Sequence, residues 1–303
     1  MFYEIWFLGS GSHGSPQSSR RPRRQTNWHN RSWLVTGLYA CWGNMTEQVL
    51  VRRAKARIKE ALYGTRIFVP VQRTYQRIFN PAAVARRHRM RALYSRLFQR
   101  GDLVFDIGAY DGVYSEVFAS LGAHVIAVEP IPECRKVLDK LSRRTTVRVE
   151  QCAAGDALGR VALWICEDSH LSTVSERWLQ RTKEMPSLCR VRWQGSIDVD
   201  VTTLDVLALR YGVPRFIKID VEGYEEQVLS GMSFSPDCLS FEFHTSTVDV
   251  VRSCLERLRV YEFNVLPGLQ MDFAYSNWVS PEEIVDWIGS YRGDQDFGEI
   301  FAR

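Results

Sequence analysis

From residue 102 to the C-terminus, short apolar runs alternate with segments in which apolar positions recur every three or four residues. The short runs predict five strands: Leu103–Ile107, Val125–Glu129, Thr146–Gln151, Phe216–Asp220 and Leu239–Phe243. The segments with helical spacing predict four helices: Val113–Leu121, Glu133–Leu141, Glu225–Leu229 and Val248–Leu258. Strands that alternate with helices are typical of a parallel sheet covered on both faces. We therefore predict an α/β fold with a Rossmann-like, doubly wound and mainly parallel sheet.

An insertion interrupts this alternation at about residues 160–203. Two stretches in it, Arg160–Cys166 and Ile197–Thr203, alternate as β-structure does, and they flank a polar segment that we interpret as a candidate substrate lid, Glu167–Gly195. Near the C-terminus, two stretches separated by a Pro-Gly turn predict a hairpin that finishes the sheet with an antiparallel strand: Glu262–Leu266 and Met271–Trp278.

The first hundred residues have a different pattern. Residues 1–44 are rich in Ser, Gly, Arg and Trp without a sustained period, so we predict a disordered or non-native extension, with Met45 as an alternative start of translation. Residues 45–100 show helical spacing that is interrupted at Pro70 and Pro81, which predicts a basic helical arm.

Charge divides the chain at the same boundary. Residues 1–100 hold 19 Lys and Arg against 3 Asp and Glu, whereas residues 101–303 hold 20 against 32. The arm either packs as a solvated cap through Leu93, Leu97 and Phe98, or its arginines steer an anionic acceptor or contact a membrane surface. Those arginines are Arg86, Arg87, Arg89 and Arg91. No recognition motif accompanies the charge, so we expect no nucleic-acid partner, and the oligomeric state is left open.

The composition is that of a globular protein, with 303 residues, of which 45% are hydrophobic and 24% charged. The longest N-terminal apolar patch, Trp33–Trp42, is shorter than the roughly 20 residues that a membrane span needs, and no clean cleavage site follows it. We therefore expect a cytoplasmic protein. The seven cysteines are scattered without C-x-x-C spacing, which indicates reduced thiols rather than a zinc site.

A glycine loop follows the first predicted strand. The chain passes Asp106, turns through Gly108 and Gly112, and reaches Glu129 at the end of the next apolar run, 23 residues after Asp106. Glycine lets a ligand approach the backbone, and an acid at the end of the second strand can bind two ribose hydroxyls. The loop lacks the G-x-G-x-x-G spacing of dinucleotide sites, and Asp106 and Asp111 lie where a diphosphate would bind. S-adenosylmethionine is cationic and carries no phosphate, so it fits this loop.

Acidic side chains follow several predicted strands at the edge where parallel sheets bind ligands. The residues at this edge are Asp106, Glu129, Asp220, Glu222, Glu242 and His244. Transfer of a methyl group to a hydroxyl needs a base, for which His244 and Asp220 are the candidates. Alternatively, these side chains have structural roles only. His244 would then form hydrogen bonds with a helix or loop, Asp106 would cap one helix, and Asp220 and Glu222 would cap another. Lys218 would pair with a neighbouring acid. A divalent cation could also bind at this edge, although our prediction assigns no metal. Its ligands would be Asp220, Glu222, Glu242 and His244.

Several motifs together resemble the FkbM family of S-adenosylmethionine-dependent methyltransferases over about residues 101–245. They are Asp106–Ser115, Val128–Pro130, Cys152–Asp156, Thr203–Asp205, Phe216–Glu225 and Phe241–His244. The resemblance implies a methyltransferase domain over residues 101–303 that methylates a hydroxyl of a saccharide, glycolipid or secondary metabolite. The alternatives are a non-catalytic protein that binds the same cofactor and an NAD-dependent oxidoreductase, which the missing dinucleotide spacing disfavours.

The resemblance also implies which residues form the site. Around the methionine moiety it places Asp106, Gly108 and Gly112, with Glu129 on the ribose and Ala154 and Asp156 near the adenine. Tyr110 and Asp111 of the same loop are further candidates for binding the cofactor. Many family members carry Asn where this chain has Asp111. The catalytic candidates are His244, Asp220 and Glu222.

Overall fold

The computed structural model describes residues 81–185, 188, 191–293 and 295–303. The chain divides into two units, residues 1–73 and 74–303. The predicted extension over residues 1–44, the alternative start at Met45 and the arm as far as residue 80 lie outside the described residues.

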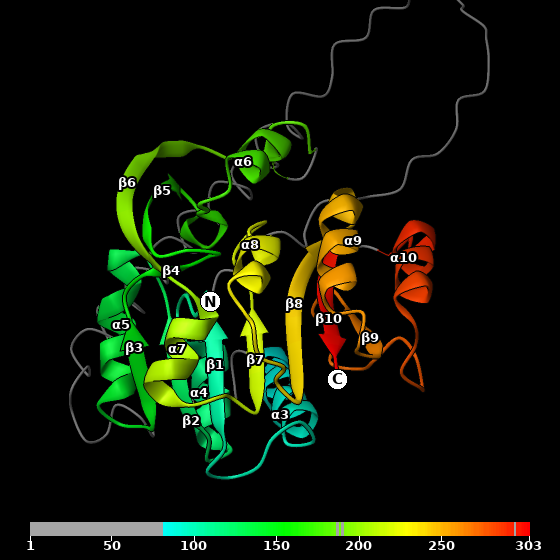
Figure 1. Ribbon diagram of the computed structural model, residues 1–303, viewed down its shortest axis with the longest axis horizontal. Coiled ribbons are helices and arrows are strands. Elements are labelled where there is room, and N and C mark those ends of the chain that lie inside the picture. The colour runs from blue at the N-terminus through cyan, green and yellow to red at the C-terminus, as the bar shows by residue number, and fades with distance from the viewer. Residues whose placement is uncertain (1–80, 186–187, 189–190, 294) are drawn as a thin grey trace, which may run out of the picture. The chain divides into compact units, whose positions relative to one another are not determined.

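A seven-stranded sheet forms the centre of the described part (Figure 1). Its order is β3 (Val147–Glu150), β2 (His124–Val128), β1 (Leu103–Ile107), β7 (Phe216–Ile219), β8 (Cys238–His244), β10 (Phe297–Ala302) and β9 (Phe263–Pro267). The first five strands are parallel, and β10 is antiparallel to both of its neighbours. The five predicted strands are confirmed within two residues at each end, and with them the Rossmann-like class of fold.

The strands form where they do because their side chains are buried on both faces. All four residues of β7 are buried, and so are the last four of β1. Phe105 and Ile107 point to one face, where they pack with α7 (Leu204–Tyr211), α8 (Glu225–Ser230), α9 (Val248–Arg257) and α10 (Pro281–Ser290). Val104 points to the other face and packs with α3 (Pro81–Tyr94), α4 (Val113–Ser120) and α5 (Pro132–Ser142). The sheet is thus doubly wound.

The end of the basic arm packs onto the sheet as a helix. α3 begins at Pro81, as the predicted break indicates, and its C-terminal turn buries Leu93 and Tyr94, with Phe98 buried just beyond it. The Tyr94 ring meets that of Phe118 edge to face at 4.9 Å between centroids. The predicted contacts of a cap, through Leu93, Leu97 and Phe98, are therefore present.

The insertion folds over the carboxyl ends of the central strands (Figure 1). Its strands β5 (Gly159–Cys166) and β6 (Trp193–Thr202) pair antiparallel, as the alternating pattern predicts, and β4 (Ala153–Ala154) joins them in a second sheet. Between them lie a 3₁₀ turn, Ser169–Leu171, and α6 (Glu176–Thr182), which Ser175 caps by accepting a hydrogen bond from the Trp178 amide.

The predicted C-terminal hairpin is wrong. The ladder partner of β9 is β10, and residues 271–278 form no strand. The backbone of this stretch and of Val279 just beyond it is linked to β9 only by the Ala274 amide, which donates to the Val265 carbonyl at 2.8 Å, and by an isolated bridge between Phe263 and Val279. That stretch alternates because it packs side chains such as Phe273 and Trp278 against the core, while its backbone bonds to the side chain of Asn264. The antiparallel strand is β10, which lies between β8 and β9, and β9 forms the edge of the sheet.

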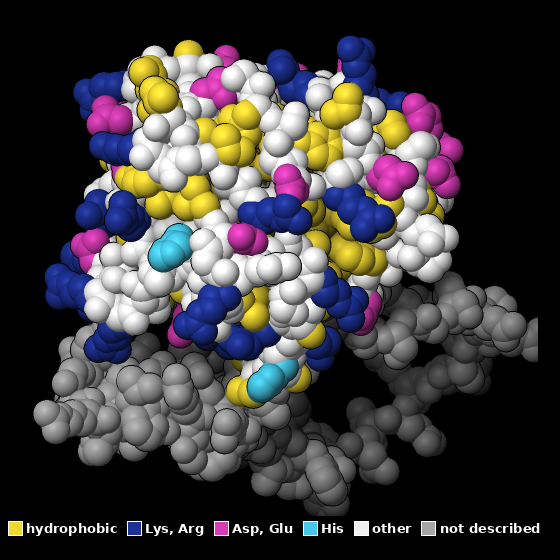
Figure 2. Space-filling view, turned by 60° about the horizontal axis from the view of Figure 1, so that its bottom comes forward, with side chains coloured by type: hydrophobic (Ala, Val, Ile, Leu, Met, Phe, Trp, Pro, Cys, Tyr) yellow, Lys and Arg dark blue, Asp and Glu magenta, His cyan; other side chains and the backbone are white. Residues whose placement is uncertain are grey.

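No helix in the described ranges is long and apolar enough to cross a membrane. The cysteines of those ranges form no disulfide: Cys134, Cys152, Cys166, Cys238 and Cys254. On the face that Figure 2 shows, Lys and Arg side chains are interspersed with acidic and apolar ones.

Candidate functional site

The glycine loop joins β1 to α4 at the point where the strand order reverses, between β1 and β7. The amides of Gly108 and Ala109 donate to the carbonyl of Val128, which fixes the loop to the end of β2. Gly108 and Gly112 have φ of 80° and 76°, and Tyr110 also has a positive φ of 45°. A Cβ at Gly108 would clash with the carbonyl oxygen of Asp220, so glycine is required there for two reasons.

Replacing Gly108 with alanine is expected to lower the free energy of unfolding by at least about 1–3 kcal/mol, because the left-handed conformation and the clash with β7 both oppose a side chain. Denaturant unfolding measures the change. Gly289→Ala is the matched control, since that glycine lies on an exposed helical face with open space around it. Equal stability of the two variants would show that the loop does not approach β7 this closely.

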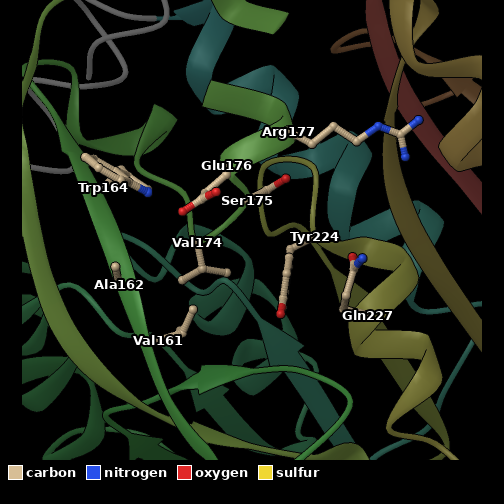
Figure 3. Close-up of a pocket in the computed structure, with 9 residues that line it drawn as sticks. All are labelled: Val161, Ala162, Trp164, Val174, Ser175, Glu176, Arg177, Tyr224 and Gln227. Carbon is tan, nitrogen blue, oxygen red and sulfur yellow. The ribbon is translucent and has the colours of Figure 1, made fainter. Parts of the chain in front are cut away.

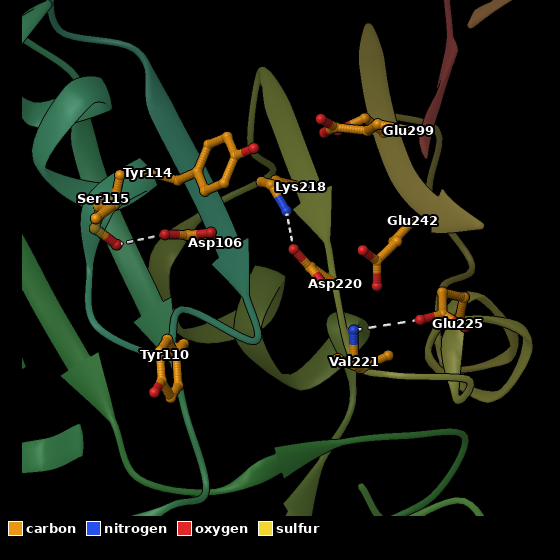
Figure 4. A network of polar contacts seen from close by, with 12 residues as sticks. Asp106, Tyr110, Tyr114, Ser115, Lys218, Asp220, Val221, Glu225, Glu242 and Glu299 are labelled. Atoms are coloured by element: carbon orange, nitrogen blue, oxygen red, sulfur yellow. Dashed lines mark hydrogen bonds and ion pairs between the residues drawn. The ribbon is translucent and has the colours of Figure 1, made fainter. Parts of the chain in front are cut away.

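Asp106 is buried beneath this loop and accepts a hydrogen bond from the Ser115 hydroxyl at 2.6 Å (Figure 4). Burial raises its pKa to about 6, although the charge of Lys218 acts in the opposite direction. The helix-cap interpretation of Asp106 is wrong: Asp111 accepts the amide of Val113 at the start of α4.

Glu129 lies at the end of β2 with 4% of its surface exposed. One carboxylate oxygen accepts the amide of Tyr110 at 2.8 Å and the other the amide of Ile131 at 2.7 Å. Burial raises its pKa to about 7, although these two hydrogen bonds act to lower it. Each oxygen of a carboxylate has a second lone pair, so Glu129 can still accept two hydroxyl donors.

After the glycine loop and Glu129, the remaining predicted cofactor residues lie in β4 and the turn after it. Ala154 is buried, and the amide of Gly155 donates to Thr202 at 2.9 Å, which joins this turn to the insertion. Asp156 follows, close enough to Tyr224 for its charge, after burial, to raise the pKa of that phenol. The predicted cofactor residues thus follow the ends of β1 and β2 in the central sheet and of β4 in the second sheet.

An ion pair between a buried lysine and a partly exposed aspartate lies beside the loop. The Lys218 ammonium, with 3% of its side chain exposed, is 2.6 Å from Asp220 and 4.3 Å from the ring centre of Tyr114 (Figure 4). Burial opposes both charges, but the attraction between the two groups outweighs it. The pKa of Asp220 is therefore lowered, and that of Lys218 lies well above its usual value. The predicted pairing of Lys218 is confirmed, and Asp220 does not cap α8.

Glu222, Glu242 and His244 form a second cluster next to Asp220. One ligand atom of each lies within 4.8 Å of the others. Glu222 takes a left-handed conformation, with φ of 53°, and does not cap α8; Glu225 instead accepts the amides of Val221 and Gly223. Burial raises the pKa of Glu222 and Glu242 well above the usual value, and the charges of neighbouring carboxylates add to it.

The insertion covers this second cluster. Thr173 donates to the carbonyl of Glu222 at 2.8 Å, and the Trp178 ring lies 4.4 Å from that of His244. Tyr110 in the glycine loop and Ser169 in the insertion share a hydrogen bond of 2.9 Å. Trp178 could not be identified from the sequence, because the apolar positions between β5 and β6 show no period that predicts how this segment folds.

A cavity of about 360 Å³ lies between β5, the start of α6, and α8 (Figure 3). Tyr224 and Gln227 line one side, Trp164 and Val174 the other, and Arg177 points away. The cavity wall continues into the apolar cluster around Ala153, Ile131 and Tyr110, beside the glycine loop. The complete lining is Val161, Ala162, Trp164, Val174, Ser175, Glu176, Arg177, Tyr224 and Gln227.

The sheet order, the glycine loop and the acidic edge define a Rossmann-like enzyme of the methyltransferase class. The chain belongs to the FkbM methyltransferase family, because the profile of the "Methyltransferase FkbM domain" matches residues 106–293, more than half of its length. The resemblance found in its motifs is thereby confirmed, and an NAD-dependent oxidoreductase is set aside.

Solved structures of other methyltransferases show distant likeness. The precorrin-6y C5,15-methyltransferase of Geobacter metallireducens is 14% identical, with 71% of this chain and 86% of that chain covered and a TM-score of 0.35. A TehB-like SAM-dependent methyltransferase of Corynebacterium glutamicum is 9% identical, with coverage of 76% and 96% and a TM-score of 0.37. The plantazolicin methyltransferase BpumL in complex with SAH is 10% identical, with coverage of 85% and 98% and a TM-score of 0.35. A comparison with curated sequences gave no match.

Proposed function

We propose that this protein transfers a methyl group from S-adenosylmethionine to a hydroxyl oxygen of a saccharide, glycolipid or secondary metabolite. One observation carries the proposal: a glycine loop without the dinucleotide spacing, next to the acid Glu129 that suits a ribose, lies directly beside the ionised, partly exposed carboxylate of Asp220. The first part suits a cationic nucleoside, and the second suits proton removal from an acceptor.

In the proposed complex the cofactor crosses the carboxyl ends of β1, β2 and β4. Its amino-acid part lies on the glycine loop, its ribose on Glu129 and its adenine against Ala154 and Asp156. Two carboxylates in this loop, Asp106 and Asp111, favour the ammonium and sulfonium charges and oppose a diphosphate. The loop residues involved are Asp106, Gly108, Tyr110, Asp111 and Gly112.

The transfer itself needs alignment and a proton acceptor. The acceptor oxygen attacks the methyl carbon, the O–CH₃ bond forms, and the S–CH₃ bond breaks with its electron pair left on sulfur. The oxygen then carries a positive charge and loses its proton readily, so a carboxylate of low pKa is a sufficient base. Lys218 keeps Asp220 in that ionised form. We assign Asp220 the proton and place Glu222 and His244 in the acceptor half of the site.

The cavity under the insertion suggests how the acceptor binds. It offers aromatic surface from Trp164 and Tyr224 together with polar groups from Ser175, Glu176 and Gln227. Polyhydroxylated molecules present apolar ring faces and hydroxyl groups, which match such a lining. This match favours a saccharide or glycolipid among the acceptor classes.

Contact of the basic arm with a membrane stays a proposal, as do a cytoplasmic location and the absence of a nucleic-acid partner. Within α3, Arg87 pairs with Glu116, Arg91 bonds to Ser120 and Arg86 to Tyr114, so these three arginines hold the helix to α4. Arg89 is exposed.

Transfer of a labelled methyl group from S-adenosylmethionine to saccharide and lipid extracts tests the proposal. We expect one class of labelled product. Its mass exceeds that of the unmethylated acceptor by the mass of one CH₂ group, and its label resists mild base because the new bond is an ether. Calorimetry with S-adenosylmethionine, S-adenosylhomocysteine and NAD is the companion measurement. Tight binding of the first two with no transfer to any extract would favour the non-catalytic alternative.

A further inference from the structure

Three side chains that commonly bind metals meet at one point with polar atoms that have no hydrogen-bond partner. These atoms are Glu222 Oε2, Glu242 Oε2 and both ring nitrogens of His244, and all of them are inaccessible to solvent. The imidazole as a whole is 11% exposed. Buried polar atoms in folded proteins nearly always have a hydrogen-bond partner, so a group of four without one indicates that a ligand belongs there.

The fold brings the three side chains together from two strand ends. Glu242 and His244 are two residues apart on β8, so they point to the same face of the sheet. Glu222 comes from the loop after β7, where its positive φ turns the chain sharply. His244 Nε2 lies 3.8 Å from Glu242 Oε2, and Trp178 covers the imidazole from the insertion.

Hydrogen bonds within the cluster do not satisfy these atoms. Glu222 Oε2, Glu242 Oε2 and the two His244 ring nitrogens lie close together, yet none of them has a hydrogen-bond partner among the described residues. A divalent cation removes the difficulty, because its two positive charges balance two carboxylates while Lys218 balances Asp220.

We infer that Glu222, Glu242 and His244 bind one divalent first-row transition-metal cation of the Mn²⁺ type. Ligand atoms at about 2.1 Å from a common ion lie roughly 3–4 Å apart, so the observed separations, all within 4.8 Å, need only small rotations to close. An imidazole nitrogen with two carboxylates suits such cations better than it suits Mg²⁺ or Ca²⁺, which prefer oxygen alone.

The role of the cation rests on the proposed function. Next to Asp220, a cation that coordinates the acceptor hydroxyl lowers the pKa of that hydroxyl, and the proton passes to the Asp220 carboxylate as the O–CH₃ bond forms. The positively charged methyl donor needs no help from the metal. The cation therefore belongs to the acceptor half of the site, and the cofactor half is independent of it.

The test uses Mn²⁺ alone with the full chain after dialysis against a chelator. Electron paramagnetic resonance is expected to show one bound Mn²⁺ per chain, and pulsed measurements to show coupling to a directly bound nitrogen. In Glu242→Gln and His244→Gln the affinity for Mn²⁺ falls at least about tenfold, and the nitrogen coupling disappears in the histidine variant. Matched controls are Glu256→Gln and His124→Gln, which change exposed side chains and leave both signals intact.

Failure of this inference can be told apart from failure of the proposed function. If the unaltered protein binds no Mn²⁺, or binds it without nitrogen coupling, the metal site is refuted regardless of how the variants fold. S-adenosylmethionine affinity is measured on the same chelated samples and is expected to be unchanged. Cofactor binding with methyl transfer in protein free of metal would refute the cation's role and leave the proposed function standing.

Discussion

Replacing Asp220 with asparagine is expected to lower kcat for methyl transfer by about 10²- to 10⁴-fold, the range that general-base catalysis contributes. The carboxylate is ionised because Lys218 lies 2.6 Å away, and it is next to the glycine loop that binds the methyl donor in the proposed complex. The asparagine amide cannot take the proton that the methylated oxygen loses. Initial rates with saturating S-adenosylmethionine measure the effect, and the affinity for the cofactor is expected to change little.

This prediction needs a control variant and a check that the altered protein is folded. Asp272→Asn changes an exposed aspartate and is expected to keep the original kcat. Because Asp220→Asn also leaves the Lys218 ammonium without its partner, its unfolding is followed by denaturant, and rates are compared only where the variant is folded. A folded Asp220→Asn protein with unchanged kcat would show that another group takes the proton.

Replacing Glu129 with alanine is expected to weaken S-adenosylmethionine binding by about 10²-fold or more at pH 8. Two ribose hydroxyls lose a charged acceptor, and each such hydrogen bond contributes about 1.5–3 kcal/mol. The loop also loses the acceptor of the Tyr110 amide, which holds it at the end of β2. Calorimetry measures the dissociation constant. Glu133→Ala, an exposed change on α5, is the control and is expected to bind normally.

The effect of Glu129 depends on pH in a defined direction. Burial raises the pKa of this carboxyl to about 7 in the free protein, and the ribose hydroxyls bind its ionised form better. The affinity of the unaltered protein therefore rises as the pH increases through 7 and levels off above it. Glu129→Ala loses that rise, and only a change near pH 6, from Asp106, remains. Equal pH profiles for the two proteins would contradict the ribose assignment.

The central strands were predictable because they are buried on both faces, so most of their positions are apolar, as in the unbroken run Val125–Val128 of β2. β10 was missed because Glu299 interrupts its run, and only the folded protein supplies the partners of that carboxyl, Tyr94 and Ser240. The start of α10 does have a sequence signature, although our prediction contains no helix there. Ser280 and Glu283 have the spacing of a capping box, which the structure confirms, and Pro281 occupies the first helical position.

Much of the candidate site was predictable for a different reason. In a parallel sheet the carboxyl ends of all strands meet at one edge, so acids after separate strands had to come together there. The partners across strands were not predictable, because they depend on register: β1 pairs Asp106 with Lys218 of β7, and β8 brings Ser240 next to that lysine. The cover that Trp178 forms over His244 depends on how the insertion folds back, which no local pattern encodes.

The most direct test of the proposed function is a crystal structure of the full chain with S-adenosylhomocysteine. The ribose hydroxyls are predicted to lie within hydrogen-bond distance of the Glu129 carboxylate, the amino-acid part on Gly108, and the sulfur on the side of Asp220. A ligand bound elsewhere, or one whose ribose has no contact with Glu129, would contradict the assignment.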